Sequence, residues 1–385
     1  MEFLIKKYFL NNEENGYASN GEVRKLLRLE DEDPEEDALI LESIDWIHGN
    51  NSCNVKGSKE LIDLYNSVDN EKMDLTLPLS EIEFSGFFHD NEIILNLDGY
   101  KAKGIYKFTD SFLDSLFSLK KFGRFCLSHG EKDMLNDNVN KLMITQKDET
   151  RQYRFLMEGE NLFLRGLTTT TYKNYDNNIA IYLALNSLHR YSESNKAHIF
   201  VESGYITDSC LDIMFVQEEK ILIDRDTIVE VGIRLSNNEI TDGSLSMEFI
   251  YSISDTKQNQ FRAIGDTVVS IVHTYTVPTI QSKLENLNQL SKYAEETVQH
   301  ISSIKNRKKL DRDQLSLIFN RLSRAKRNEL SKNSKESIDA LYREEVIGNT
   351  YSLIELFGKI GSLGTTIDEK LFIQVVFNEL ITEGL

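Results

Sequence analysis

The sequence predicts an α+β fold, with a mixed or antiparallel sheet core followed by a helical C-terminal domain. Within residues 197–254, apolar side chains repeatedly occupy every second position, which is typical of strands with one buried face. After Pro278 the apolar spacing changes to three or four residues, which indicates helices. We therefore expect an acidic N-terminal region with short strands (1–104), an α+β core (105–277) and a helical C-terminal domain (278–385).

Shorter patterns predict the elements before residue 254. Residues 75–108 alternate as strands do, and residues 109–145 carry apolar side chains at helical spacing. Gly159 supplies the turn of a predicted hairpin over residues 153–165. The segment 179–188 is apolar nearly all round and predicts a buried helix. The stretch Ser236–Glu239 has turn chemistry.

The C-terminal region shows one long helical pattern and several helix boundaries. Apolar residues keep roughly heptad spacing over residues 280–304, which predicts a coiled-coil-like helix and a possible self-contact. Asp311 with Gln314, and Thr366 with Glu369, form capping-box signatures. The glycine-rich segment 358–365 lacks the spacing of a phosphate loop, so we expect a loop between two helices.

Several classes of function lack support in the sequence. The three cysteines are odd in number and far apart, which fits a reducing cytoplasm and argues against disulfides. No stretch of 18 apolar residues occurs, so we expect no membrane span. The seven histidines show no metal-ligand spacing, and no catalytic motif is present. We therefore predict no metal, no cofactor and no catalytic residue, and we favour a binding protein over an enzyme.

The chain is strongly acidic, with a formal net charge of −18. This charge repels phosphate backbones at long range, so any nucleic-acid contact must use a local basic patch. Seven carboxylates surround Pro34 in the segment 30–37. This run is interpreted either as a solvated loop or as an acidic tether for a basic partner or a mimic of nucleic acid.

The most distinctive charged segment is basic and spans residues 301–335, with eleven Lys and Arg residues against three acidic ones. At helical spacing, one side is apolar and Arg321, Arg324 and Arg327 form a stripe on the other. Such arginines suit phosphate groups, although pairing with acidic residues of this chain or another copy is an open alternative. The candidate nucleic-acid-binding residues in this segment are Lys305, Arg307, Lys308, Lys309, Arg312, Arg321, Arg324 and Arg327.

A second set of candidates lies in the predicted hairpin. Arg154 and Arg165 stand among Tyr153, Phe155 and Phe163. Aromatic and basic side chains on one sheet face can stack on bases and hold a single strand. The alternative is that these residues alternate between core and solvent.

Two segments carry a family resemblance. Residues 163–177 (FLRGLTTTTYKNYDN) and residues 231–248 (VGIRLSNNEITDGSLSME) occur in order within the range 109–275. Together with the helical stretch 109–142, they resemble the phage/plasmid-like protein family called domain of unknown function family 932. The family pattern usually continues to a C-T-N-G string, where this chain has Ser252–Asp255. The resemblance implies a setting in phages, plasmids and mobile elements, and no catalytic residue follows from it.

These observations predict a nucleic-acid-binding accessory factor in the DNA metabolism of a mobile element, and we expect it to form oligomers. Its expected partners are single-stranded nucleic acid and, through the 280–304 helix, a second copy. The alternative prediction is a protein-interaction module, such as an anti-defence or host-takeover factor that binds a host protein. The acidic N-terminal region and the heptad spacing favour this alternative.

Overall fold

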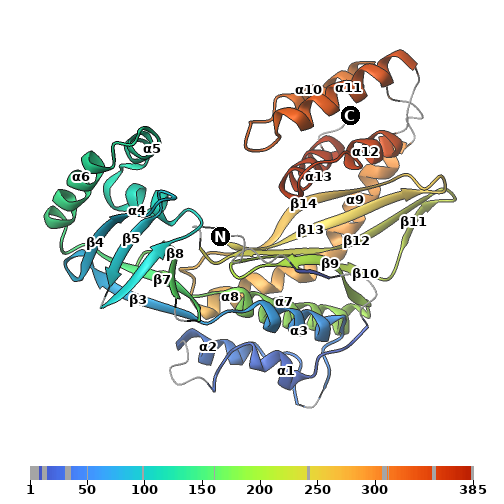
Figure 1. Cartoon of the computed structure of the whole chain (residues 1–385). Helices are drawn as coiled ribbons and strands as arrows, with labels where there is room; N and C mark the ends of the chain where they lie inside the picture. Colours follow the sequence, from blue (N-terminus) through green and yellow to red (C-terminus); the bar gives the residue numbers. More distant parts are fainter. Residues whose placement is uncertain are drawn as a thin grey trace.

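The computed structural model describes residues 8–10, 15–30, 36–49, 51–97, 99–159, 161–240, 243–305, 310, 312–348 and 353–382. In this part of the chain, the strands form two sheets and helices cover both of them (Figure 1). The predicted α+β class is confirmed.

The smaller sheet and its helices form what we call the six-stranded unit, residues 72–168. The strand order is β3-β7-β8-β6-β5-β4, and only the β6–β8 pairing is parallel, so the sheet is mixed. Its strands are β3 (Lys72–Pro78), β4 (Ile82–Phe87), β5 (Ile93–Leu97), β6 (Tyr100–Gly104), β7 (Thr150–Glu158) and β8 (Asn161–Thr168), with the short 3-10 helix η2 (Leu79–Glu81) between β3 and β4.

Local sequence explains the connections of this unit. Gly159 has a φ of +61°, and β7 and β8 form the predicted hairpin around it. The predicted helical region 109–145 is three helices, α4 (Phe108–Phe117), α5 (Lys120–His129) and α6 (Lys132–Thr145). Phe112, Leu113 and Val139 pack these helices into the core of the unit.

The larger sheet has eight strands and was the clearest expectation from the sequence. Its main order is β1-β9-β10-β12-β13-β14, with β11 paired to β12 and β2 paired to β9. The strands are β1 (Tyr8–Leu10), β2 (Val55–Lys56), β9 (Ile199–Ile206), β10 (Cys210–Gln217), β11 (Ile221–Asp224), β12 (Thr227–Asn238), β13 (Leu245–Asp255) and β14 (Gln260–Ile271). The turn expected at Ser236–Glu239 begins later, because β12 continues to Asn238 and Ser236 pairs with Ser246 of β13.

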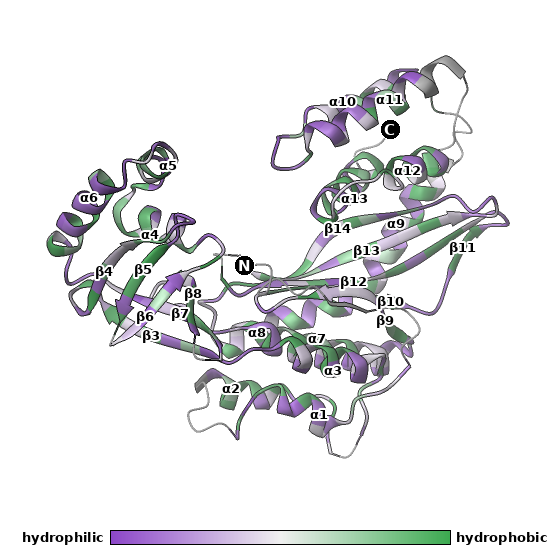
Figure 2. Cartoon of the chain, in the orientation of Figure 1, coloured by the Kyte–Doolittle hydropathy of each residue, from purple (hydrophilic) through white to green (hydrophobic). Residues whose placement is uncertain are grey.

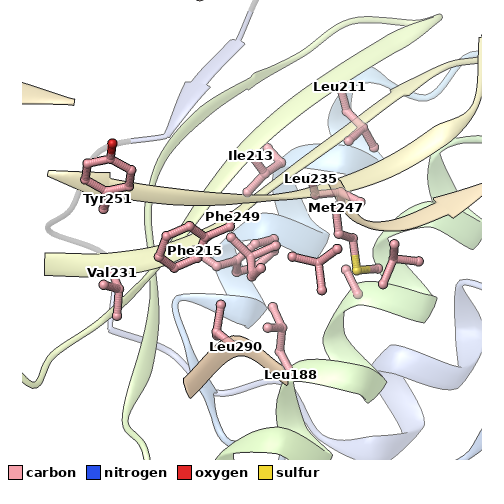
Figure 3. Close-up of a cluster of buried hydrophobic side chains, with 14 of the residues drawn as sticks. Leu188, Leu211, Ile213, Phe215, Val231, Leu235, Met247, Phe249, Tyr251 and Leu290 are labelled. Atoms are coloured by element: carbon pink, nitrogen blue, oxygen red, sulfur yellow. The ribbon is translucent and has the colours of Figure 1, made fainter. Parts of the chain in front are cut away.

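One face of this sheet packs on the helix predicted to be buried, α7 (Asn177–Asn195). Ile213, Phe215 and Phe249 from the sheet meet Leu188 of α7 and Leu290 in one cluster (Figure 3). The same side carries the N-terminal helices α1 (Asn20–Lys25), α2 (Glu36–Leu41), η1 (Glu42–Ile44) and α3 (Ser58–Val68) (Figure 1).

The C-terminal helices share this core. They are α8 (Val277–Leu284), η3 (Glu285–Gln289), α9 (Leu290–Lys305), α10 (Arg312–Ser323), α11 (Lys332–Gly348), α12 (Leu353–Gly361) and α13 (Ile367–Thr382). Phe357 of α12 and Phe377 of α13 stack on each other and contact Phe261 of β14 edge to face.

Two expectations for this region need correction, and the capping box predicted at Asp311 and Gln314 stays a prediction. The predicted continuous helix over 280–304 is interrupted by η3, and its residues Ile280, Leu284, Leu287, Leu290 and Ala294 are buried in the chain's own core rather than left for a second copy. The expected loop at 358–365 starts only after Gly361, because α12 contains Gly358 and Gly361. Asp311 lies outside the described residues.

The predicted domain boundaries also differ from the observed units. Strands β3 to β6 fall in the expected N-terminal region, yet they pair with β7 and β8 of the expected core. The C-terminal helices contribute to the core of the eight-stranded sheet instead of forming one of their own. Boundaries near 104 and 278 therefore divide structures that are held together by strand pairing and by shared apolar contacts.

Candidate functional site

From Arg312 onward, the basic C-terminal segment folds as the helix α10 followed by a turn. Leu315, Ile318, Leu322 and Ala325 are buried, as the helical pattern predicts. The helix α10 ends at Ser323, however, so Arg324 and Arg327 lie in the turn before α11 and do not continue a helical stripe. We call Arg324, Lys326 and Arg327 the basic turn.

Glu369 fixes the start of α11, which directly follows the basic turn, to the start of α13. The Ser331 N–H donates to Glu369 Oε1 over 2.7 Å, and the Ser334 hydroxyl donates to the same oxygen over 2.8 Å. The Thr366 N–H donates to Glu369 Oε2, and Thr366 Oγ1 accepts from the Glu369 N–H, which confirms the predicted capping box. Burial by itself raises the pKa of Glu369, but these donors outweigh it and lower the pKa to about 2.

The three cations of the basic turn are exposed, and no carboxylate among the described residues forms an ion pair with any of them. Arg312, at the start of α10, is exposed in the same way. Figure 2 shows the turn between α10 and α11 as hydrophilic. In contrast, Arg321 donates from Nη2 to Glu379 over 2.6 Å, so a carboxylate already balances its charge.

The alternative pairing with the acidic N-terminal run is not found among the described residues. At the end of that run, Asp37 pairs with Lys173 over 2.8 Å, far along the chain from the basic turn. The residues 31–35 lie outside the described part. So do Arg307, Lys308 and Lys309, and for Lys305 only its place at the end of α9 is described.

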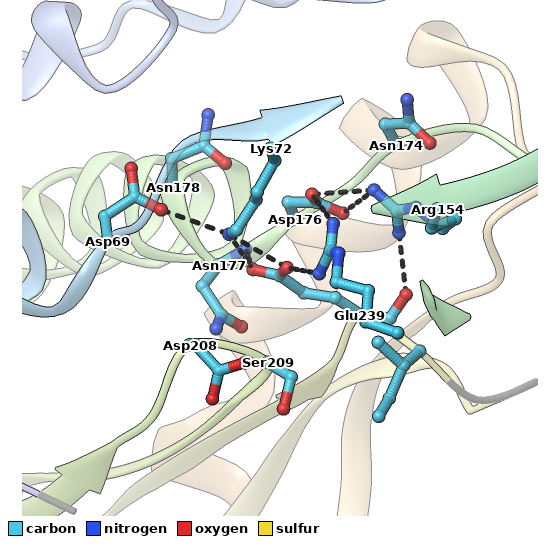
Figure 4. Close-up of polar contacts among 12 residues, drawn as sticks. Asp69, Lys72, Arg154, Asn174, Asp176, Asn177, Asn178, Asp208, Ser209 and Glu239 are labelled. Carbon is cyan, nitrogen blue, oxygen red and sulfur yellow. Dashed lines mark hydrogen bonds and ion pairs between the residues drawn. The ribbon is translucent and has the colours of Figure 1, made fainter. Parts of the chain in front are cut away.

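The hairpin arginines occupy a different place from the predicted one. Arg154 and Arg165 are each 1% exposed, so neither offers a donor to a phosphate backbone. Both belong to an ionic cluster of three cations and three carboxylates, which we define as Lys72, Asp74, Arg154, Arg165, Asp176 and Glu239. Figure 4 labels Lys72, Arg154, Asp176 and Glu239 of this cluster. The expectation that these two arginines bind nucleic acid is therefore wrong for the folded chain.

Arg154 makes contacts on all sides of its guanidinium group. Its Nη2 donates to both oxygens of Asp176 over 2.9 and 2.8 Å, and its Nε lies 3.2 Å from Asp74 Oδ2. Its Nη1 donates to the Glu239 carbonyl over 2.7 Å. The ring of Tyr172 lies 5.6 Å from the guanidinium carbon.

Arg165 and Lys72 complete the cluster around Glu239. Arg165 donates to the Glu239 carboxylate and, over 3.2 Å, to Asp176. Lys72 Nζ lies 2.9 Å from Glu239 Oε2, and the Asn177 N–H donates to Glu239 Oε1 over 2.9 Å. Burial disfavours the charge of Asp176, yet Arg154 and Arg165 outweigh this and hold its pKa well below the usual range.

The ionic cluster joins the two sheets. Lys72, Asp74, Arg154 and Arg165 come from β3, β7 and β8, whereas Asp176 precedes α7 and Glu239 follows β12. A buried charge destabilises the fold unless it is paired and hydrogen-bonded. The ionic cluster therefore holds the two units in one orientation only when each of its charges has a partner.

Residues 163–177 and 231–248, two segments far apart in the sequence, meet in this cluster. Arg165 and Asp176 belong to the first segment, Glu239 belongs to the second, and Asn237 of the second donates to Asn177 Oδ1 of the first. One sequence feature indicated this contact: charged residues stand within otherwise apolar strands. Such residues are usually paired when they are buried.

A cleft of about 1000 Å³ lies on the other side of Arg165, between the six-stranded unit and the eight-stranded sheet. Helix α4 and the end of β8 line one wall, the connection from β9 to β10 (207–209) lies at the base, and Asp368 of α13 lines the opposite side. No sequence pattern indicates this cleft, because its lining comes from segments more than 200 residues apart.

Contacts at the base of the cleft tie its two walls together. The Tyr106 hydroxyl, from the segment before α4, donates to the carboxylate of Asp208. Asp208 is buried, and this burial raises its pKa. Beside it, Arg234 holds Asp212 and Glu248 on the face of the eight-stranded sheet opposite to α7.

The described residues contain no group of three or more His, Cys, Asp or Glu side chains suited to a metal ion. None of the described helices has the length and apolar character needed to cross a membrane. No protein-family model matches the chain, and the searches of curated proteins and of solved structures also returned no match.

Proposed function

We propose that this chain is a nucleic-acid-binding accessory protein that acts in the bacterial cytoplasm in the DNA metabolism of a phage, plasmid or related element. The basic turn carries the proposal, since its three cations are exposed, close in sequence and unpaired among the described residues. The resemblance of residues 163–177 and 231–248 to a phage/plasmid-like family supports the setting.

The acidic character of the whole chain restricts how binding can occur. With a net charge of −18, most of the surface repels phosphates, so contact must be confined to a patch like the basic turn. Arginine offers paired donors that match the geometry of a phosphate group. Affinity that depends on such contacts falls steeply with salt, because binding releases counterions.

The test is the binding of a double variant, Arg324→Glu with Arg327→Glu, to a fluorescent oligonucleotide. Arg321 stays unchanged, because its reversal would place a carboxylate against Glu379. We expect binding to be lost or its salt dependence to fall by roughly one unit of slope for each contact removed.

The matched control is Lys25→Glu with Lys59→Glu, which makes the same change in charge at exposed lysines of α1 and α3. This control should bind like the unmodified chain, and both variants should keep the circular dichroism spectrum and melting temperature of a folded protein. Equal binding by a folded basic-turn variant and its control would overturn the assignment of the basic turn.

A further inference from the structure

We infer that the cleft between the two units holds a single-stranded segment of the nucleic acid whose phosphates the basic turn contacts. This inference rests on the proposed function and adds a second contact surface and a strand class to it.

Position is the first argument. The Ser331 N–H donates to Glu369 and so fixes the chain directly after the basic turn to the first turn of α13. The neighbouring residue in that turn, Asp368, lines the cleft. The chain directly after the basic turn is therefore anchored beside a residue that lines the cleft, and Figure 1 shows the turn between α10 and α11 on the side of these helices that faces the six-stranded unit.

The lining of the cleft suits a polar, anionic strand. The hydroxyl groups of Ser111 and Thr169 line the cleft and can donate to phosphate and sugar oxygens. Lys107 is exposed on the α4 wall and has no ionic partner among the described residues. A volume of about 1000 Å³ is at the upper end for small-ligand sites, and this leaves room for more than one nucleotide.

Two of the carboxylates that line the cleft, Asp114 and Asp208, have a partner within the chain. Lys120 Nζ lies 3.4 Å from Asp114, and Asp208 accepts the Tyr106 hydroxyl while its pKa is raised by burial. Asp114 and Asp368 are both exposed, and of these two only Asp368 lacks an ion pair among the described residues. The phosphates are therefore expected on the Lys107 wall, away from Asp368.

Two tyrosines are the reason to expect a single strand in the cleft rather than a duplex. Tyr106 and Tyr205 both line the cleft, and each is partly exposed. Stacking of a base on an aromatic ring needs an unpaired base, which a single strand provides and a duplex does not.

Photo-crosslinking tests the inference on the full chain. The probe is an oligothymidylate of about 15 nucleotides that carries a single 5-iododeoxyuridine, within the length range of single-strand sites. After irradiation and proteolysis, mass spectrometry is expected to find the crosslink on Tyr205 or Tyr106. Crosslinks confined to peptides outside the cleft would overturn the inference.

A charge variant gives a second and independent result. Lys107→Glu should weaken single-strand binding at least about fivefold, which is the scale of a single lost contact, whereas the control Lys101→Glu changes an exposed lysine of β6 that does not line the cleft and should have no effect. Equal affinity of the two variants would count against the cleft. If the unmodified chain bound no oligonucleotide, the proposed function would fail; if it bound with normal salt dependence but without cleft crosslinks, only this inference would fail.

Discussion

At the scale of single residues, we expect the loss of one side chain to lower stability most in the buried ionic cluster. Arg165 is paired with Glu239 and Asp176 in the protein interior, where an unpaired charge is costly. Arg165→Met removes the cation and leaves Glu239 with less compensation. We expect the free energy of unfolding to fall by about 3–5 kcal/mol, the range for breaking a buried pair.

Urea unfolding at neutral pH measures this loss, with Arg124→Met as the comparison. Arg124 pairs with Asp110 on the surface, where solvent screens the pair, so its loss should cost far less stability than the loss of Arg165. Similar losses in the two variants would show that the ionic cluster contributes no more than a surface pair.

Glu369 gives a pH dependence whose sign follows from its pKa. The pKa is lowered from 4.5 to about 2 in the folded chain, so the stabilising contribution is complete above pH 4.5 and is lost as the pH falls toward 2. Glu369→Gln should therefore lower the melting temperature at neutral pH, and this difference should shrink between pH 4.5 and 2. A series of thermal melts checks it, and a difference that stays constant across the range would contradict the assigned pKa.

At the scale of elements, substitution by alanine is predicted to have opposite effects on stability at two glycines. A Cβ atom at Gly232 of β12 would lie 2.1 Å from the Phe215 carbonyl oxygen of β10, which is backbone that cannot move without opening the sheet. A Cβ atom at Gly361 of α12 would meet nothing closer than Phe377 at 4.0 Å. Alanine should therefore destabilise the sheet at Gly232 and stabilise the helix at Gly361.

We expect Gly232→Ala to cost several kcal/mol, beyond the 1–3 kcal/mol typical of overpacking, and Gly361→Ala to stabilise by about 0.5–1 kcal/mol. Chemical denaturation of the two purified variants measures both values. A Gly232→Ala variant as stable as the unmodified chain would contradict the close approach of β10 and β12.

Local patterns in the sequence predicted most elements, and they failed where long-range contacts decide the outcome. Alternation identified the long strands, and the Gly159 turn and the capping box at Thr366 were confirmed because each depends on neighbours within a few residues. The helix over 280–304 was expected to be continuous, since periodicity does not reveal the 3-10 turn at 285–289.

The candidate site was less predictable for the same reason. From the sequence, Arg154 and Arg165 were expected to be free to bind nucleic acid. Their partners Asp74, Asp176 and Glu239 are up to 85 residues away, so local patterns do not reveal the pairing. The cleft also depends on segments that only the fold brings together. The basic turn was visible as a cluster of charges, but the end of α10 at Ser323 was not, since no proline or glycine marks it.

At the scale of the whole molecule, the ionic cluster couples two units that have separate apolar cores. Trp46 is the only tryptophan and packs against the core of the eight-stranded sheet, so its fluorescence reports that unit. Circular dichroism reports both units. In the unmodified chain we expect the two signals to give the same urea midpoint.

Arg154→Met should separate these midpoints, because it removes contacts from the six-stranded unit to Asp176 and to the Glu239 carbonyl. The circular dichroism signal should then begin to change at lower urea than the Trp46 signal. Coincident transitions in this variant would show that other contacts couple the units.

The central claim is that an acidic protein binds nucleic acid through a local basic patch. The most direct measurement is the affinity of the purified chain for single-stranded and double-stranded DNA and for RNA at about 50 and 200 mM salt, the range in which phosphate-driven binding falls steeply. We predict measurable binding at the lower salt, strongest for single strands, and a steep loss at the higher salt. Absence of binding at both salt concentrations would contradict the claim and would direct attention to protein partners of the same surface.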